Sequence, residues 1–296
     1  MNTPTSNNEK LTGSWWGTDA VSVWYGKVLA LDRVTFRAAP GQVSAVVGGD
    51  GAGRTTLLRC LAGALAASEG EIRRPAARQI GYLPAGSGTY PDLTVAENLA
   101  FRAAVYGVSA DPRGADYLER AGLSAARDRL AGRLSGGMRQ KLGVIAAMVH
   151  QPALLVLDEP TTGVDPVSRV ELWSLIARAA ADGAAVVLAT SYLDEAERAS
   201  QVLALDAGRE LAAGTPEQIV AAMPGTVLVM DSRPVGDAAR RAWRRNARWR
   251  VWVPDGPAAA LGGPAALGEP VQADLQDAVT VASLARELAM SGGDQQ

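Results

Sequence analysis

The 296-residue sequence has one cysteine, one histidine and almost no net charge. The single cysteine, Cys60, excludes a disulfide within the chain, and its leucine-rich surroundings predict a buried apolar residue. A formal net charge of −2 argues against a protein that binds nucleic acid by bulk electrostatic attraction. No run of about 18 uncharged apolar residues is present, so no membrane-spanning helix is predicted. The polar N-terminus lacks the apolar core of a signal peptide, and we therefore expect a cytoplasmic protein.

The composition, with 48% hydrophobic and 20% charged residues, is that of a soluble globular protein. At this length the chain can hold one large domain, or a large domain with a small appendage. Alternating strand-like and helix-like segments predict an α/β fold with a mainly parallel sheet. We expect disordered tails at 1–14 and 291–296, a large domain at 15–222 with a helical part at about 88–150, and a small α+β domain at 225–290.

A glycine-rich turn between a strand and a helix is the most informative stretch of the chain. The apolar run Val43–Val47 predicts a buried strand, and leucines at helical spacing follow the turn. This arrangement binds phosphate, because glycines let backbone N–H groups surround the anion and the helix N-terminus adds partial positive charge. The predicted nucleotide-binding residues of this loop are Gly48, Asp50, Gly51, Ala52, Gly53, Arg54, Thr55 and Thr56.

Two positions of this loop are the most informative about Mg²⁺ and phosphate binding. Thr55 stands where the phosphate-binding motif places the hydroxyl that binds Mg²⁺. The pattern G-x-x-x-x-G-K-[ST] has a lysine after its last glycine, and this chain has Arg54 there. Arginine keeps the positive charge, but its longer planar fork does not reproduce a compact ammonium nested in the loop. We expect nucleotide still to bind, since backbone amides and Mg²⁺ do much of the holding.

Three further sites are candidates for nucleotide chemistry. Tyr25 ends a predicted strand at 21–25, and it is interpreted either as an edge-strand aromatic or as a ring that stacks on adenine. The predicted strand at 153–157 ends in Asp158 and Glu159, at the edge where α/β sheets place their ligands. A second potential anion site precedes a predicted helix, and it consists of Leu134, Ser135, Gly136, Gly137 and Met138.

The pattern of predicted strands and helices changes after about residue 225. We expect strands at 227–230 and 249–253, and helices at 235–245 and 278–290. The basic and aromatic stretch 240–252 is one candidate for a nucleic-acid surface. Its tryptophans, however, alternate with arginine and valine as in a half-buried strand, which favours a small accessory domain.

Taken together, these pieces resemble the ATP-binding subunit of an ABC transporter over roughly residues 20 to 222. The glycine loop corresponds to the family's Walker A motif. Three further matches follow in the family's order, and they are the signature motif LSGGM at 134–138, the Walker B motif LLVLDEP at 154–160 and the D-loop at 162–166. The spelling GxDGAG and the stretch YLDEAER at 192–198 are similar to the exporter branch, which includes drug-efflux subunits.

The resemblance implies a set of roles for these residues. Asp158 would hold Mg²⁺ together with Thr55, and Glu159 would polarise the attacking water. Asp165 would touch a partner subunit, and Ser135 and Gly137 would face the ATP bound by that partner. The implied ligands are ATP and Mg²⁺. The implied partners are an integral-membrane permease and a second ATP-binding subunit, with no nucleic acid, at the inner face of the cell membrane.

The sequence departs from the family pattern at three positions. Besides Arg54, it has Ala85 where the family has a glutamine, and Ser191 where the family has a histidine. The chain's one histidine, His150, ends the helix after the signature and is interpreted as structural. Removing one preorganised donor to a transition state costs roughly 10²–10³ in rate, so we expect slow ATP hydrolysis at this chain's own site.

Three functional hypotheses follow. Because Glu159 and LSGGM are intact, we favour a heterodimer in which this signature motif completes the site of a competent partner, powering export through a separate permease. The second hypothesis is a non-catalytic regulatory or structural subunit that binds nucleotide in such a complex, which Arg54, Ala85 and Ser191 favour. The third is an ABC-type ATPase acting on ribosomes or in DNA repair, although such proteins usually carry tandem ATPase halves or long coiled-coil insertions.

Overall fold

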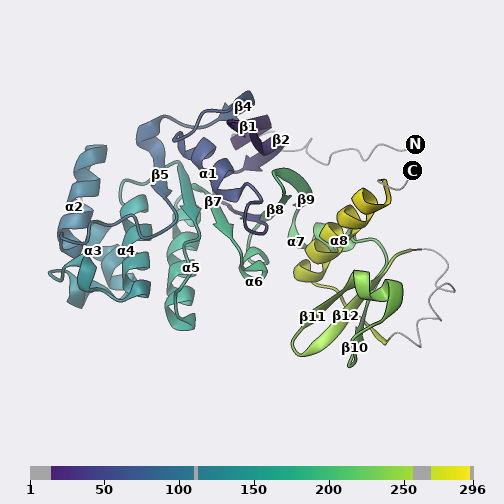
Figure 1. Ribbon diagram of the computed structural model, residues 1–296. Helices are drawn as coiled ribbons and strands as arrows, with labels where there is room; N and C mark the ends of the chain where they lie inside the picture. Colours follow the sequence, from purple (N-terminus) through teal and green to yellow (C-terminus); the bar gives the residue numbers. More distant parts are fainter. Residues whose placement is uncertain (1–14, 110–112, 256–267, 294–296) are drawn as a thin grey trace. The chain divides into compact units, whose positions relative to one another are not determined.

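The computed structural model describes residues 15–109, 113–255 and 268–293. The chain forms two compact units, Met1–Glu210 and Leu211–Gln296, and the division falls within strand β9 (Figure 1). The tail predicted at 1–14 lies outside the described residues.

Three strands form an antiparallel sheet in the order β2-β1-β4. Their bounds are β1 (Trp16–Tyr25), β2 (Val28–Ala38) and β4 (Glu69–Arg73). The turn from β1 to β2 uses Gly26 at a φ of 60° and pairs Tyr25 with Val28. The strand predicted at 21–25 is confirmed as the second half of β1. Strand β1 begins earlier, at Trp16, because its first residues pair with the end of β2.

The larger sheet has six strands in the order β5-β6-β7-β3-β8-β9. Neighbours from β5 through β8 are parallel. The bounds are β3 (Val43–Val47), β5 (Ile80–Leu83), β6 (Leu154–Asp158), β7 (Ala185–Thr190), β8 (Gln201–Asp206) and β9 (Arg209–Gly214). Strands β3, β6 and β7 are buried along their whole length, as their continuous apolar sequences require. The predicted α/β class is confirmed.

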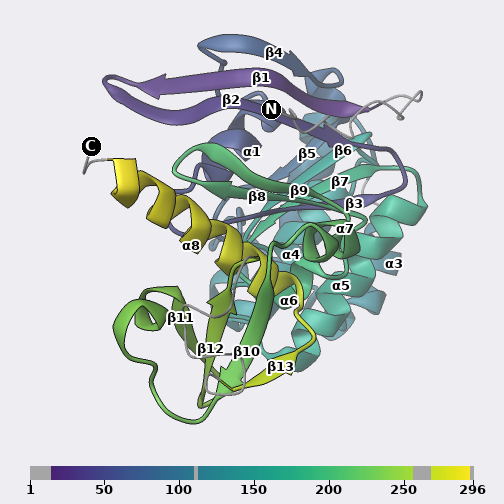
Figure 2. The ribbon, with the colours of Figure 1, turned by 90° about the vertical axis from the view of Figure 1, so that its right-hand side faces the viewer.

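Helix α1 (Arg54–Ala62) lies between the two sheets (Figure 2). Leu57, Leu58 and Leu61 are fully buried in one core with side chains of β1, β2 and β3. Burying a leucine stabilises a fold by roughly 1.5–3 kcal/mol, so this face fixes the start of α1 against the end of β3. The glycine loop between them is therefore held at both ends by the core.

Helices and short 3₁₀ turns make up most of the segment predicted to be helical. Within 88–150 these are α2 (Val95–Tyr106), α3 (Arg113–Arg120), η2 (Ser124–Ala126), η3 (Ala131–Arg133) and α4 (Gly136–Met148). The turn η1 (Ala77–Gln79) precedes this segment, and α5 (Pro166–Ala181) follows it. Thr94 and Glu97 form a capping box at the start of α2. Helix α6 is short and spans Leu193–Ala196.

His150, at the end of the α4 segment, is packed as the sequence predicts for a structural histidine. Its side chain is 9% exposed, and its ring stacks on Tyr106 with centroids 3.5 Å apart and planes 1° from parallel. Burial lowers the pKa of His150 to about 4, so the ring is uncharged at neutral pH.

The second unit is a four-stranded antiparallel sheet in the order β11-β12-β10-β13 (Figure 1). Its elements are α7 (Pro216–Ala221), β10 (Thr226–Met230), η4 (Gly236–Arg241), β11 (Ala242–Arg245), β12 (Arg248–Val253), β13 (Glu269–Val271) and α8 (Leu275–Gly293). Val281 of α8 packs with Val227 and Trp252 of the sheet. Helix α8 continues to Gly293, so the tail predicted from residue 291 begins with a helical end, and 294–296 lie outside the described residues.

A buried ion-pair cluster joins α8 to this sheet. Asp277 has a fully buried side chain and accepts hydrogen bonds from Arg250 and, at 3.3 Å, from Arg245. Arg245 also donates to Asp274 at 2.8 Å. Arg250, predicted in a half-buried strand, and Arg245, predicted at the end of a helix, thus both bind carboxylates at the start of α8.

The helix predicted at 235–245 is wrong. The segment forms the 3₁₀ turn η4 and then strand β11, which pairs with β12 so that Trp243 lies opposite Arg250. Asn246 and Ala247 connect the two strands with φ values of 49° and 66°, the geometry of a tight two-residue hairpin. Strand pairing and the packing of Trp243 in the core outweigh the helical preference of alanine and arginine.

Among the described residues, no helix has both the length and the apolar character that crossing a membrane requires.

Candidate functional site

The glycine loop is pressed against neighbouring backbone at both ends. A Cβ added to Gly48 would lie 2.4 Å from the carbonyl oxygen of Leu205, and one added to Gly53 would lie 2.7 Å from that of Ala30. Gly53 also has a φ of 101°, which side chains rarely adopt. Glycine is required at these two positions, and the loop approaches β2 and β8 so closely that its path is fixed.

The N-terminus of α1 has no side-chain cap. Thr94, Ser135, Asp165 and Thr215 each accept a hydrogen bond from the first turn of α2, α4, α5 and α7, respectively. At α1 the N-cap residue is Gly53, no side chain caps the helix, and its first turn contains no acidic residue. The first N–H groups of α1 therefore have no side-chain acceptor of the kind that α2, α4, α5 and α7 use. They fit an anion such as a phosphate group.

Asp158 provides a carboxylate beside this helix end. It is the last residue of β6, its residue exposure is 1%, and its Oδ2 atom has no hydrogen-bond partner among the described residues. Burial raises the pKa of the Asp158 carboxyl, and a hydrogen bond with the Thr55 side chain acts in the opposite direction. A buried, unsatisfied carboxylate oxygen next to a hydroxyl fits a hard divalent cation such as Mg²⁺, which prefers oxygen ligands.

Glu159 follows directly in an unusual backbone conformation. Its φ is 52°, in the left-handed region, and its N–H donates to the carbonyl oxygen of Ala189 at 3.0 Å. Non-glycine residues in this region cost on the order of 1 kcal/mol or more and concentrate at functional sites. The Oε2 atom accepts a hydrogen bond from Thr162 at 2.8 Å, and the N–H and hydroxyl of Ser191 lie 3.4 Å from it.

Arg54 pairs with Glu159. The guanidinium Nη1 donates to Oε1 of Glu159, and its Nη2 lies 3.8 Å from a carboxylate oxygen of Asp50. The side chains of Arg54 and Glu159 are 11% and 20% exposed, whereas that of Asp50 is fully exposed. The residue that replaces the motif's lysine is thus bound to the carboxylate predicted to polarise water.

Tyr25 lies at the end of β1 and is 44% exposed, so its ring is accessible. A hydrogen bond with the Tyr25 hydroxyl raises the pKa of Arg59 on α1, and one with Tyr82 acts in the same direction. Tyr25 therefore lies next to the helix that starts at the glycine loop, and its adenine-stacking role stays a prediction.

The signature residues form a second group with Asp165. Ser135 caps α4 by accepting from the N–H of Met138 at 3.2 Å, and it is exposed. A Cβ on Gly137 would lie 3.4 Å from Oδ2 of Asp165, so the N-termini of α4 and α5 meet here. Leu134 is buried beneath them, whereas Gly136 is exposed. Within the described part of the chain, no hydrogen bond or ion pair joins this group to the glycine loop.

Ala85 and Ser191 occupy the two other positions at which the sequence departs from the pattern. Ala85 is exposed just beyond β5, and its methyl group has no polar atom to offer a ligand. Ser191 follows β7, and its hydroxyl lies 3.4 Å from Oε2 of Glu159.

Two residues that sequence reasoning did not single out support Glu159. Thr162 bonds its carboxylate, and Gln140 of α4 donates from Nε2 to its carbonyl oxygen at 3.3 Å. The spacing of three residues between Glu159 and a hydroxyl residue is the local signal for the Thr162 contact. Gln140 is distant in sequence, and only the fold connects it to the site.

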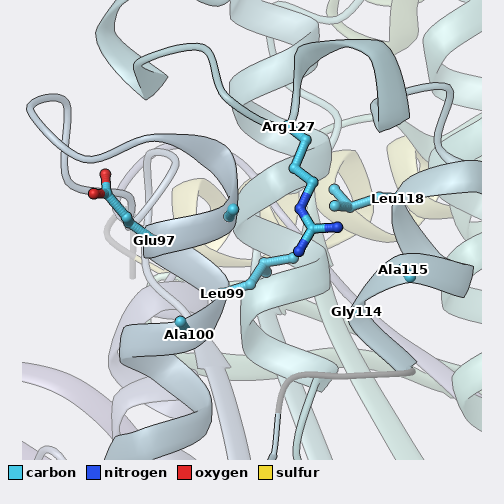
Figure 3. A pocket seen from close by; sticks show the side chains of 8 residues that line it. Glu97, Leu99, Ala100, Gly114, Ala115, Leu118 and Arg127 are labelled. Atoms are coloured by element: carbon cyan, nitrogen blue, oxygen red, sulfur yellow. The ribbon is translucent and has the colours of Figure 1, made fainter.

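A separate cavity of about 200 Å³ lies between α2 and α3 (Figure 3). Arg127 extends between Leu99 and Leu118 there, and small side chains form much of the wall. Its lining residues are those of the helical region and include none of the glycine loop, so it is not part of the site described above.

Comparison with known proteins identifies relatives of this chain. Residues 31–162 match the model of the family described as "ABC transporter". The chain is 41% identical over 210 residues to the probable multidrug ABC transporter ATP-binding protein YbhF of Escherichia coli (strain K12), a match that covers 67% of this chain and 36% of that protein. The chain thus spans about a third of the length of that relative.

A second relative is matched over most of its length. The Nod factor export ATP-binding protein I of Paraburkholderia xenovorans (strain LB400) is 35% identical over 221 residues, which cover 70% of this chain and 73% of that protein. Among solved structures, the ATP-binding subunit of an ABC transporter superposes with a TM-score of 0.65 at 29% identity, covering 70% of this chain and 92% of that one.

Proposed function

Because this chain belongs to the ABC transporter family of ATP-binding proteins, we propose that it is the ATP-binding subunit of an exporter. ATP would bind at the glycine loop, and a separate integral-membrane permease would carry the transported molecule. The observation that carries the proposal is the meeting of Thr55 and Asp158 at the uncapped N-terminus of α1. Two relatives are named for multidrug transport and for Nod factor export, which supports export as the direction.

The loop and the residues around it would bind different parts of ATP. The amides of Gly51, Gly53 and the first turn of α1 would receive the β- and γ-phosphates, and the exposed Tyr25 ring would stack on adenine. Thr55 and Asp158 would hold Mg²⁺, which supplies positive charge against the phosphate oxygens when it is bound.

Slow hydrolysis at this site is part of the proposal. Arg54 keeps the charge of the motif's lysine, but its planar guanidinium does not reproduce the compact ammonium that the motif places at the phosphates. Ala85 and Ser191 offer neither the amide nor the imidazole of the family pattern at the two other positions.

The signature group would act on a partner's nucleotide. Ser135 is exposed at the N-terminus of α4, with the buried Gly137 behind it beside Asp165, and an anion from another subunit would meet helix-end N–H groups there. The partner would be a second ATP-binding subunit with an intact site, in a heterodimer with this chain. The signature group of this chain would then complete the partner's ATP site. The association would be peripheral, at the inner face of the cell membrane.

The alternative is a non-catalytic subunit whose bound nucleotide is structural or regulatory. The three departures from the family pattern, Arg54, Ala85 and Ser191, favour it. The two possibilities differ in whether Ser135 contributes to hydrolysis by a partner.

The test is recovery of the tagged chain from membranes of the cells that produce it, with a non-hydrolysable ATP analogue and Mg²⁺ present. The expected result is co-purification of an integral-membrane protein and a second ATP-binding chain, together with measurable ATP binding by this chain alone. Recovery with ribosomes or DNA-repair proteins, or the absence of ATP binding, would contradict the proposal.

A further inference from the structure

Arg54 and Glu159 occupy each other in the chain as it stands. Arg54 extends from the first residue of α1 and Glu159 follows β6, and 105 residues separate them in the sequence. Both side chains are largely withdrawn from water, at 11% and 20% exposure. A charge-assisted hydrogen bond between partly buried groups is stronger than one on an open surface, so this pair is a substantial interaction.

The pair leaves Glu159 with few acceptor sites. Its Oε1 atom accepts from Arg54, and its Oε2 atom accepts from Thr162 with Ser191 close by. A carboxylate has about four lone-pair sites, and this arrangement occupies most of them. Glu159 is therefore held in place and neutralised by residues of its own chain.

A phosphate group at the glycine loop would compete with the Glu159 carboxylate for the guanidinium of Arg54. In the phosphate-binding motif, the basic residue after the last glycine reaches the β- and γ-phosphates. The guanidinium of Arg54 is directed at Glu159 instead, the fully exposed Asp50 lies 3.8 Å from it, and the charge of Arg54 also acts on the carboxyl of Asp158. One guanidinium fork serves one carboxylate or phosphate well at a time.

We infer that Arg54 and Glu159 form a latch that a nucleoside triphosphate opens. The triphosphate draws Arg54 away from Glu159, so binding of nucleotide costs the ion pair and at the same time releases the carboxylate. Nucleotide affinity is lowered by the latch, and Glu159 becomes available only when a triphosphate is present. The inference rests on the proposed function, because it requires nucleotide at the glycine loop.

A double-mutant cycle tests the latch by affinity rather than by turnover. The full-length chain, Glu159→Gln, Arg54→Met and the double variant are each titrated with Mg²⁺ and the non-hydrolysable analogue AMP-PNP in a calorimeter. Glu159→Gln has the same shape without the charge, and Arg54→Met keeps most of the side-chain length. Thermal melts confirm folding, and Glu159→Ala with Arg54→Leu replaces any variant that does not fold.

The latch predicts that Glu159→Gln raises the affinity of the Arg54 chain about tenfold more than it raises that of the Arg54→Met chain, which corresponds to 1.4 kcal/mol of coupling. Simple repulsion between Glu159 and phosphate gives the opposite order, because the charge of Glu159 is fully unmasked only when Arg54 is absent. An equal or smaller effect in the Arg54 chain would therefore overturn the latch while leaving nucleotide binding intact.

A matched control removes another ion pair. Glu171 pairs with Lys141 between α5 and α4, and Glu171→Gln makes the same isosteric change away from the glycine loop. It should leave AMP-PNP affinity unchanged, and a rise like that of Glu159→Gln would overturn the latch. Failure of all the chains to bind AMP-PNP would instead contradict the proposed function, and the latch would fall with it.

Discussion

Arg54 and Glu159 meet as an ion pair where the start of α1 faces the end of β6. The first occupies the position at which the phosphate-binding motif has its lysine, and the second follows the buried carboxylate Asp158. In the family pattern, the first position binds phosphate and the second polarises water. In this chain the two side chains bind each other instead. The consequences of this arrangement for binding, stability and turnover can be measured separately.

Asp158→Asn should separate metal binding from stability. The Asp158 carboxylate is 1% exposed with an unpartnered Oδ2, so replacing its charge should stabilise the nucleotide-free chain by about 1 kcal/mol. The same change should abolish the gain in AMP-PNP affinity that Mg²⁺ gives the unaltered chain. Thermal melting and titrations with and without Mg²⁺ measure the two effects. Asp116→Asn, at an exposed pair with Arg120, is the control that changes neither. Retention of the full Mg²⁺-dependent gain would contradict the assignment.

Ser135→Asp should distinguish the two roles of Ser135. Aspartate is a good N-cap, so this variant should keep the stability of α4, whereas Ser135→Ala should lose about 1 kcal/mol. In a complex with a hydrolysing partner, the added carboxylate should repel the partner's γ-phosphate and lower turnover by roughly 10²-fold or more. Nucleotide affinity of this chain alone should not change. A complex that hydrolysed ATP normally with Ser135→Asp would contradict a role in the partner's site.

His150 should make the chain sensitive to acid. Its pKa is about 4 in the fold and 6.5 in the unfolded chain, so the unfolded state binds more protons between these values. Stability is therefore complete above pH 6.5 and falls as the pH drops toward 4, by about 3 kcal/mol for this residue. Urea unfolding at pH 7 and pH 4.5 measures the loss, and His150→Phe should reduce it while keeping the stack on Tyr106. Because the chain has one histidine, its ring signal in NMR reports the pKa directly, and titration near 6.5 would refute the prediction.

Asp277→Asn should loosen the second unit. Asp277 is fully buried with Arg245 and Arg250, and removing one partner of a buried ion pair costs about 3–5 kcal/mol. Hydrogen exchange of peptides from β12 and α8 should become faster, while exchange in β3 and β6 stays the same. Asp231→Asn is the matched control, because its pair with Arg248 is exposed, and it should have little effect. Unchanged exchange in α8 would show that the cluster contributes little.

The sequence predicts those elements best whose signal is local. The strand Val43–Val47 was predicted with its observed bounds, because its apolar run is bounded by glycine and it is buried on both faces. The helix predicted after the signature motif is confirmed, and it begins at Gly136 because Ser135 is its cap.

Non-local effects account for the rest. The helix predicted at 235–245 is a turn and strand because β12 offers a partner, and the tight hairpin at Asn246 was the overlooked local signal. The Arg54–Glu159 pair joins residues 105 positions apart. Composition and spacing place both residues near a phosphate, but only the packing of α1 against β6 brings the two charges together.

The central claim is that this chain's own site binds nucleotide and hydrolyses it slowly. Steady-state ATP hydrolysis by the purified chain, with Glu159→Gln as the blank, tests it most directly when AMP-PNP binding is measured on the same preparations. We expect ATP turnover indistinguishable from that of Glu159→Gln, together with saturable binding of AMP-PNP. Turnover well above the blank would show that Arg54 replaces the motif's lysine in catalysis and that the chain is a competent ATPase by itself.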